Sequence, residues 1–293
     1  MTKQNKRVIL VTGASRGVGK GIAEGIAQPG DIIICAARSM AEGTKVQQFG
    51  FEINSSLEDT VNNINKKGAQ GIPYEIDLNK PDEILNLATF VKEEFGCLDL
   101  LVHAACQIHD DLVTPKPYWE KSLDLWSVID VGLKSNYFLS HALTPLMIES
   151  KGKLILQISS HGAMCYMHGP IYGAQKAAID KMAFDMAHDL KPFNICSLSL
   201  WSGIVKDEKT KKVSEQHGEQ YAEFLKGAAS QEYAGMVINE IYQDSEIMNF
   251  SGSTLIAAEI GNKYGIKDID SKSPQSDRES LGGPRKYSDT VIY

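Results

Sequence analysis

Tyr172 and Lys176 are the residues of this sequence best suited to proton-transfer chemistry. They stand four positions apart, and residues i and i+4 of a helix share a face, so a helix here would point a phenol and an ammonium into one cleft. A nearby cation favours the phenolate and lowers the pKa of a tyrosine, which would make Tyr172 a general acid or base near neutral pH. A helix with this pair is more often only a helix, so the motif needs a second signal.

Two serines precede this pair, and a hydroxyl beside Tyr172 could hold the oxygen of a carbonyl or an alcohol. Ser159 lies thirteen residues before Tyr172, and Ser160 is its neighbour. A hydroxyl aimed at an oxygen that gains negative charge would stabilise that charge during the reaction.

The second signal is a glycine-rich turn near the N-terminus. Residues 8–11 form a short, apolar, β-branched run typical of a buried parallel strand, and a helical pattern begins near Val18. Gly13, Gly17 and Gly19 lie at the junction between them. Glycines let a backbone approach a ligand closely, and the N-terminus of a helix attracts anions. The turn therefore predicts a dinucleotide pyrophosphate site rather than a plain β–α connection.

Together these motifs resemble those of the short-chain dehydrogenase/reductase family, over about residues 6–262. The motifs that carry the resemblance are the turn 12–19, the pair Asp77-Leu78, and the group Ser159, Tyr172 and Lys176. The resemblance implies an α/β fold, a three-layer Rossmann fold whose doubly wound parallel sheet forms a single domain. We expect this domain over residues 1–270, with an insertion near 40–54 and a mobile C-terminal tail over 271–293.

The resemblance also implies the site residues. Ser159, Tyr172 and Lys176 would be catalytic: Tyr172 donates the proton, Lys176 lowers its pKa, and the serine holds the substrate oxygen. Ser160 is the neighbouring alternative, but the spacing of Ser159 to both Gly162 and Tyr172 fits the family pattern without a gap. No metal is implied. The residues implied to bind the cofactor are Gly13, Ser15, Arg16, Gly17, Val18, Gly19, Arg38, Asp77, Leu78, Ala104, Tyr172, Lys176, Ile204 and Val205.

The end of the second predicted strand indicates which cofactor is bound. An acidic residue there would hold the ribose 2′-hydroxyl of NAD, whereas an arginine accommodates the 2′-phosphate of NADP. This chain has Arg38, and Arg16 in the glycine turn could join it. Guanidinium groups suit phosphate through paired hydrogen bonds. Both arginines could instead be solvent-facing ion-pair partners, but the pattern favours NADP(H).

The function implied is an NADP(H)-dependent oxidoreductase of the carbonyl reductase type. It would transfer hydride between the nicotinamide and the carbonyl or alcohol of a small hydrophobic substrate, such as a ketone, an aldehyde, or a steroid- or retinoid-like compound. Segments 107–119, 161–171 and 206–230 are expected to form the substrate wall. The aromatic residues and methionines in the first two favour an apolar substrate, although ordinary packing would use the same residue types.

Two departures from the family pattern support an alternative function. The segment 103–106 reads His-Ala-Ala-Cys where the family usually has Asn-Asn-Ala-Gly, and His103 is expected to be structural. Gly132 stands where many members place an asparagine that anchors a proton-relaying water. The alternative is therefore a catalytically impaired, NADP(H)-binding regulatory protein.

The hydrophobic pattern predicts alternating strands and helices along the domain. Strands are expected at residues 8–11, 32–37, 71–76, 98–103, 153–159, 194–200 and 251–257. Helices are expected at residues 18–27, 55–67, 81–95, 125–150 and 172–190. The resemblance also implies a homodimer or homotetramer, partly through the long helices. Leu139, Leu143 and Met147 would suit such a contact, and equally would suit packing inside the subunit.

Charge and composition exclude several classes of protein. The net charge of −7 and pI near 5.6 argue against a nucleic-acid partner, which would normally require a basic face. The five cysteines have no metal-ligand spacing, and their odd number fits a reducing compartment. No apolar run reaches about 18 residues, so we expect no membrane span. No signal-peptide pattern precedes the first strand. These features predict an intracellular, cytoplasmic protein, with peripheral membrane association left open.

Overall fold

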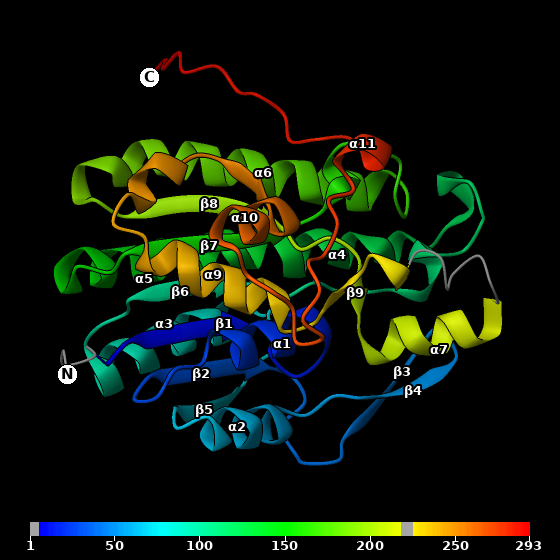
Figure 1. Cartoon of the computed structure of the whole chain (residues 1–293), viewed down its shortest axis with the longest axis horizontal. Helices are drawn as coiled ribbons and strands as arrows, with labels where there is room; N and C mark the ends of the chain where they lie inside the picture. The colour runs from blue at the N-terminus through cyan, green and yellow to red at the C-terminus, as the bar shows by residue number, and fades with distance from the viewer. Residues whose placement is uncertain (1–5, 218–224) are drawn as a thin grey trace.

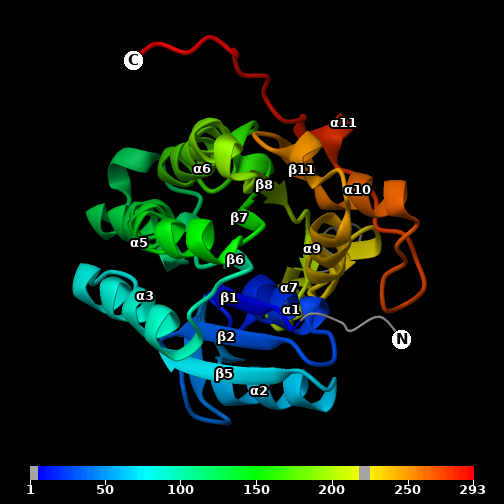
Figure 2. The same cartoon turned by 90° about the vertical axis from the view of Figure 1, so that its left-hand side faces the viewer.

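A seven-stranded parallel sheet forms the middle layer of the molecule, and helices cover both of its faces (Figures 1 and 2). The computed structural model describes residues 6–217 and 225–293. The strands are β1 (Val8–Thr12), β2 (Ile32–Ala37), β5 (Gln70–Glu75), β6 (Leu100–His103), β7 (Leu154–Ser159), β8 (Cys196–Trp201) and β11 (Thr254–Ile256). Their order across the sheet is β5-β2-β1-β6-β7-β8-β11, and all neighbours are parallel. The predicted doubly wound Rossmann fold is confirmed.

The central strands form because most of their residues are apolar, and β1 and β2 are rich in β-branched side chains, which suits strands buried on both faces. Every residue of β1 and β2 is buried. Successive side chains point to opposite faces, so Ile9 and Val11 enter the core on one side of the sheet. Val8 and Leu10 enter the core on the other side. The sheet therefore separates two apolar cores.

Each core is closed by helices with a buried apolar stripe. One lies under α1 (Gly17–Ile26), α2 (Leu57–Lys66), α9 (Tyr233–Gln243) and α10 (Ala257–Tyr264). The other lies under α3 (Pro81–Phe95), α5 (Ser135–Ser150) and α6 (Pro170–Leu190). Leu139, Leu143 and Met147 of α5 are buried in this second core, so they pack inside the chain and are not available to a second copy.

The insertion predicted near residues 40–54 forms an antiparallel hairpin, β3 (Lys45–Gln48) and β4 (Phe51–Asn54). The two residues between the strands, at 49 and 50, both have positive φ, which is the backbone of a tight hairpin turn. The hairpin reaches α7 (Glu208–His217), where the Glu208 carboxylate accepts a hydrogen bond of 3.0 Å from the Asn54 backbone N–H. The insertion and the segment after β8 therefore close over the same side of the molecule.

The helix predicted over residues 125–150 is interrupted. The chain instead forms η3 (Leu123–Trp126), a short α4 (Ser127–Ile129), a π-helical segment η4 (Asp130–Lys134), and only then α5. Segments of π-helix inside α-helices are rare and often occur at functional sites. Gly132 lies at the centre of this one.

Several short elements complete the chain. They are η1 (Asp110–Leu112), η2 (Tyr118–Glu120), η5 (His161–Ala163), η6 (Lys191–Phe193), β9 (Val205–Lys206), β10 (Ala229–Ser230), η7 (Ile247–Phe250) and α11 (Arg278–Leu281). None of the helices within residues 6–217 and 225–293 combines the length and hydropathy that a membrane crossing requires.

The tail over residues 271–293, expected to be mobile, contacts the domain at several points. Arg278 of α11 makes two hydrogen bonds of 2.7 Å to Glu259 on α10. Beyond α11 the tail runs outside the helical layer (Figure 1). There the Tyr287 ring packs 5.0 Å from the Phe184 ring of α6, between ring centres. The tail is thus attached along α6, and its mobility stays an expectation.

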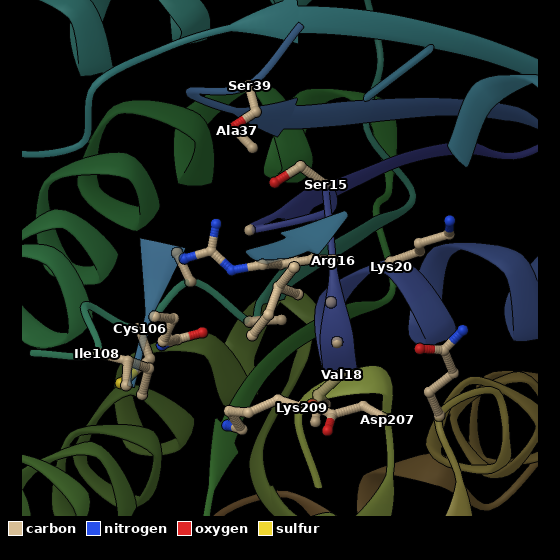
Figure 3. Close-up of a pocket in the computed structure, with 18 of the residues that line it drawn as sticks. Ser15, Arg16, Val18, Lys20, Ala37, Ser39, Cys106, Ile108, Asp207 and Lys209 are labelled. Atoms are coloured by element: carbon tan, nitrogen blue, oxygen red, sulfur yellow. The ribbon is translucent and has the colours of Figure 1, made fainter. Parts of the chain in front are cut away.

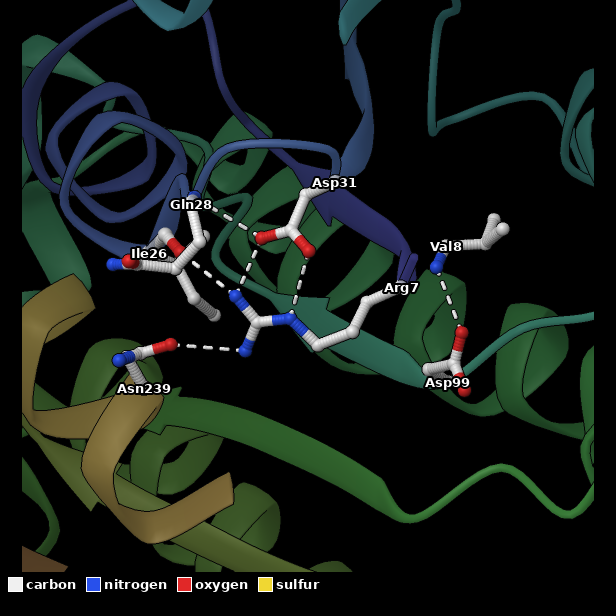
Figure 4. Close-up of polar contacts among 7 residues, drawn as sticks. All are labelled: Arg7, Val8, Ile26, Gln28, Asp31, Asp99 and Asn239. Carbon is white, nitrogen blue, oxygen red and sulfur yellow. Dashed lines mark hydrogen bonds and ion pairs between the residues drawn. The ribbon is translucent and has the colours of Figure 1, made fainter. Parts of the chain in front are cut away.

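A buried ionic network links the amino ends of β1 and β2 to α9 (Figure 4). Arg7, just before β1, donates to Asp31 just before β2, with Nε 3.0 Å from Oδ1. Its Nη1 donates to Asn239 of α9 at 2.9 Å. Both charged side chains are at most one-tenth exposed. Asp31 is thereby paired with Arg7 at the amino ends of the strands.

Replacing Asp31 with alanine should destabilise the fold by about 3–5 kcal/mol, because it leaves the Arg7 guanidinium buried without its counter-charge. The matched control is Glu52→Ala, since Glu52 and its partner Lys45 are more than half exposed. That change should cost no more than about 1 kcal/mol. Urea unfolding of the two variants measures both values, and equal losses would contradict a special role for the buried pair.

Candidate active site

A cleft of about 530 Å³ opens at the carboxyl ends of the strands, where β1 and β6 lie side by side and the order of the sheet reverses. In open α/β sheets, ligands bind at this switch point. Figure 3 shows Arg16 extending into the cleft between the end of β2, at Ala37 and Ser39, and the loop residues Cys106 and Ile108. Ten of the predicted cofactor residues line it, namely Gly13, Ser15, Arg16, Gly17, Val18, Gly19, Arg38, Asp77, Leu78 and Ala104.

The floor of the cleft depends on a close approach between two backbones. Gly13 has φ +74°, and a Cβ there would lie 2.7 Å from the Ala105 Cα. A Cβ at Gly19 would lie 2.2 Å from the Gly13 carbonyl oxygen. The Thr12 hydroxyl holds the same loop by accepting from the Ala104 N–H at 3.3 Å. Only glycine fits at positions 13 and 19. The packing of these two backbone segments is therefore sufficient to explain the glycines of the predicted turn.

Helix α1 begins at Gly17 directly beside this floor, and the side chain of its N-cap residue, Arg16, makes no capping hydrogen bond. The first N–H groups of a helix have no partner inside the helix, and they favour anions. The turn therefore presents the donors that a pyrophosphate requires.

Arg16 and Arg38 both line the cleft. Burial and the neighbouring Arg38 cation lower the pKa of Arg16, while Asp207 raises it. The Arg16 Nη1 donates to Ser55 Oγ at 3.0 Å. Among the described residues neither arginine forms an ion pair with a carboxylate. Two adjacent cations without such a counter-ion suit a phosphate group, so the chain's own residues fit the predicted NADP 2′-phosphate.

Ser55 was missed by sequence reasoning. It ends the inserted hairpin, and its hydroxyl lies 3.1 Å from both the Ser15 and the Ser39 hydroxyls as well as bonding Arg16. The only available signal was the insertion itself, because an insertion after β2 must return to the sheet near Arg38.

The structure places Ser160, and not Ser159, against the phenol. The Ser160 Oγ lies 3.1 Å from the Tyr172 Oη. Ser159 is the last residue of β7, 2% exposed, and its hydroxyl donates to the Lys176 carbonyl oxygen at 3.2 Å. Neighbouring residues of a strand point to opposite sides, so only one of the two can face the phenol. The geometry favours Ser160 as the hydroxyl beside the phenol, whereas spacing favours Ser159.

Lys176 lies below the phenol and is 5% exposed. Its Nζ donates to the Ile158 carbonyl oxygen at 3.2 Å and lies 5.4 Å from the centre of the Tyr172 ring. Burial raises the pKa of Tyr172, and this outweighs the opposing effects of the Lys176 cation and the Ser160 hydrogen bond. The expected lowering by Lys176 is present, but the net direction in this structure is upward.

Asp180 lies one helical turn below Lys176 and is 4% exposed. Its carboxylate accepts the Trp201 indole N–H at 3.1 Å. Burial raises the pKa of Asp180 to about 6, against the hydrogen bonds of Trp201, Ser159 and Ser199. The Ser159 hydroxyl thus bonds to residues of α6 and helps to hold this helix against the sheet.

Ile204 and Val205 are not brought to the main cleft. Ile204 lines a smaller cavity of about 150 Å³ beside His161 and Tyr233, and Val205 is buried in the short strand β9. Within the described part of the chain, no cluster of three or more His, Cys, Asp or Glu side chains could hold a metal ion.

The altered loop after β6 serves two purposes. The His103 Nε2 lies 2.8 Å from the Ser140 Oγ on α5, and burial lowers the pKa of His103 to about 3, so the imidazole stays neutral and braces the sheet. Cys106 lines the cleft, and its Sγ lies within 4.0 Å of the carboxamide of Gln175. His103 is structural as predicted.

Tyr172 also packs against apolar side chains. Leu112, Leu125 and Val128 form a small buried cluster, and Ile108, Ile171 and Tyr172 pack against it. These residues come partly from the predicted wall segments 107–119 and 161–171. Of the third predicted segment, 206–230, residues 218–224 lie outside the described chain.

Comparison with known proteins agrees with this architecture. A sequence model described as short chain dehydrogenase matches residues 7–218. Dehydrogenase/reductase SDR family member 1 of Homo sapiens is 30% identical over 282 residues, covering 92% of this chain and 86% of that protein.

Two solved structures share the fold. L-sorbose reductase from Gluconobacter frateurii, complexed with NADPH and L-sorbose, has a TM-score of 0.68 at 21% identity, covering 86% of this chain and 94% of that chain. A 3-oxoacyl-(acyl-carrier protein) reductase from Brucella melitensis, in complex with NAD, has a TM-score of 0.71 at 20% identity, covering 87% and 96%. At these identities the likeness concerns the fold alone.

The raised pKa of Asp180 predicts a pH-dependent stability. The folded chain holds this proton up to about pH 6, whereas an unfolded aspartate releases it near pH 4. Ionisation of Asp180 therefore removes up to about 3 kcal/mol of stability as pH rises from 4 to 7. Asp180→Asn carries no such proton, so its stability relative to the unchanged protein should rise by that amount over the same interval. Denaturant unfolding at both pH values measures the difference, and a pH-independent difference would contradict the assignment.

Proposed function

We propose a specific reaction for this chain, which belongs to the short-chain dehydrogenase family of nicotinamide-dependent oxidoreductases. The proposed reaction is the interconversion of a carbonyl and an alcohol on a small hydrophobic substrate, with NADP(H) as cofactor. The observation that carries it is the 3.1 Å contact between Ser160 and Tyr172 above Lys176, next to a cleft built for a dinucleotide.

The bound nicotinamide would supply or accept the hydride, and the protein supplies position and a proton. Tyr172 keeps its proton at neutral pH because burial raises the pKa of its phenol, which suits a general acid in the direction of reduction. The Ser160 hydroxyl would share the substrate oxygen with that phenol, because the two hydroxyl oxygens lie 3.1 Å apart. Lys176 holds positive charge beneath the phenol, where it favours the phenolate left after proton donation.

The preference for NADP(H) is supported by Arg16 and Arg38. Both arginines line the cleft, Arg38 directly after β2, and the charge of Arg38 acts on Arg16. The described residues that line the cleft at the end of β2 are Ala37, Arg38 and Ser39, and none of them is acidic. One of the structural neighbours was solved with NADPH and the other with NAD, so the choice of cofactor rests on these two arginines.

The substrate class is supported by the apolar cluster that Tyr172 joins. Ile108 and Ile171 pack against the same cluster as Tyr172 and carry no group that would bind charge or sugar hydroxyls. We therefore expect ketones or aldehydes with an apolar body, including steroid- or retinoid-like compounds, to be better substrates than sugars. The alternative, a regulatory protein that binds NADP(H) without turnover, is favoured by the missing side chain at Gly132 and by the altered segment 103–106, in which His103 braces the sheet.

Ser160→Ala should lower kcat/KM for a carbonyl substrate by about a hundredfold, because it removes the hydrogen-bond donor aimed at the developing oxyanion. NADPH affinity should be unchanged. The matched control is Ser159→Ala, which removes the neighbouring hydroxyl and should leave kcat/KM within about threefold while lowering stability. Steady-state kinetics on both variants decide the assignment, and a larger loss in Ser159→Ala would reverse it.

Arg38→Ala should weaken NADPH binding by about ten- to a hundredfold, because charge-assisted hydrogen bonds to the 2′-phosphate are lost. NADH carries no such phosphate, so its affinity should hardly change. Arg285→Ala removes an exposed arginine of the tail, outside the cleft, and serves as the control. Fluorescence titration with both nucleotides gives the affinities, and parallel losses for NADPH and NADH would exclude phosphate recognition by Arg38.

A further inference from the structure

The carboxamide of Gln175 fills the space that a side chain at position 132 would need. A Cβ built on Gly132 would lie 1.5 Å from the Gln175 Nε2 and 2.8 Å from its Cδ. No side chain larger than hydrogen can therefore occupy position 132 while Gln175 keeps this conformation. Gly132 and Gln175 are both buried, and Gln175 is 0% exposed.

Gln175 lies where three parts of the candidate site meet, namely α6, the segment η4 and the loop after β6. It belongs to α6, between Tyr172 and Lys176, and residues i and i+3 share a helix face, so it lies on the Tyr172 side. Its amide reaches the π-helical segment η4, which packs against α6. Cys106, from the loop after β6, lies 3.9 Å from its Nε2. The same thiol is close enough to Tyr172 to raise the pKa of the phenol.

The buried carboxamide has unused hydrogen-bonding capacity. A glutamine amide offers two N–H donors and an acceptor oxygen with two lone pairs. Among the described residues, the only hydrogen-bonding partner of the Gln175 amide is the Cys106 thiol, at 3.9–4.0 Å, which is a weak partner. Buried polar groups without full protein partners are normally completed by ordered water. The Lys176 ammonium likewise has three N–H donors and one acceptor, the Ile158 carbonyl, in this part of the chain.

We propose that Gln175 is a positioning residue for the proposed reaction, which this inference takes as its premise. Its carboxamide supplies from α6 the hydrogen-bonding group that Gly132 cannot supply from η4. It orders a water beside the Tyr172–Lys176 pair. When Tyr172 has given its proton to the substrate oxygen, the phenolate regains one proton from solvent through this water, so each turnover consumes one solvent proton.

The first test is Gln175→Met, which keeps the length and packing of the side chain but removes its hydrogen bonds. We expect kcat to fall by about ten- to a hundredfold, as for other losses of positioning, with NADPH affinity unchanged. The solvent deuterium isotope effect on kcat should increase, because proton return becomes slower. A purely structural role would change stability and NADPH binding and leave the isotope effect where it was. A Gln175→Met variant with the kcat and isotope effect of the unchanged protein would overturn the proposal.

The second test moves the amide from position 175 on α6 to position 132 on η4. Gly132→Asn alone should lower the melting temperature and activity, because its side chain clashes with Gln175. Combined with Gln175→Ala, the same asparagine has room and should restore kcat well above that of Gln175→Ala. The matched control, Gly132→Ala with Gln175→Ala, fills space with a methyl group and should not restore it. Equal recovery in the two double variants would mean that packing alone matters, and no recovery in either would also contradict the role.

The melting temperatures of these variants form a double-mutant cycle that reads the contact without any turnover. Strong coupling between positions 132 and 175 is expected, and additive effects would contradict the juxtaposition itself. If the unchanged protein binds NADPH but reduces no substrate, the proposed function fails and the role of Gln175 fails with it. Coupling in the cycle with failed amide transfer would overturn only the role.

Discussion

The site depends on the close approach of two backbones at the carboxyl ends of β1 and β6. The Gly13 turn packs against Ala105 so tightly that a single Cβ would separate them. This contact sets the floor of the nucleotide cleft and fixes the direction in which α1 leaves the sheet. It also determines where the loop after β6 places Cys106, and hence which surface of α6 this loop contacts. The cofactor cleft and the proton-transfer group are therefore two ends of one packed unit.

Charge is distributed along the strands to match this arrangement. At the amino ends, Arg7 and Asp31 neutralise each other in a buried pair that includes Asn239. At the carboxyl ends, Arg16 and Arg38 lie near each other without a comparable ion pair among the described residues. Arg16 is partly buried and Arg38 is exposed, so both can lie in the cleft without a protein ion pair, and both can meet an anionic ligand there. The fold therefore pairs the buried charges at the amino ends of the strands and leaves the arginines at the carboxyl ends available for an anion.

Local sequence patterns predicted the elements well where local forces decide. Apolar runs with clear end signals gave the bounds of β2 and of α3, which begins at Pro81, and the glycine turn is explained by backbone contact alone. The errors lie where distant residues decide. Spacing could not distinguish Ser159 from Ser160, because the pleat of β7 determines which hydroxyl meets Tyr172. The broken helix around Gly132 could not be foreseen, since the side chain that fills the gap comes from position 175. The direction in which the pKa of Tyr172 shifts depends on the burial of its phenol, and burial cannot be read from the sequence.

The central claim is that Tyr172 donates a proton during NADPH-dependent reduction of an apolar carbonyl compound. The most direct measurement follows NADPH consumption by the unchanged protein and by Tyr172→Phe, against apolar ketones and aldehydes, with NADPH binding measured in parallel by protein fluorescence. The account predicts consumption by the unchanged protein and a loss of about a hundredfold or more in Tyr172→Phe, with equal NADPH binding. Tight binding without consumption by the unchanged protein, or full activity in Tyr172→Phe, would contradict it.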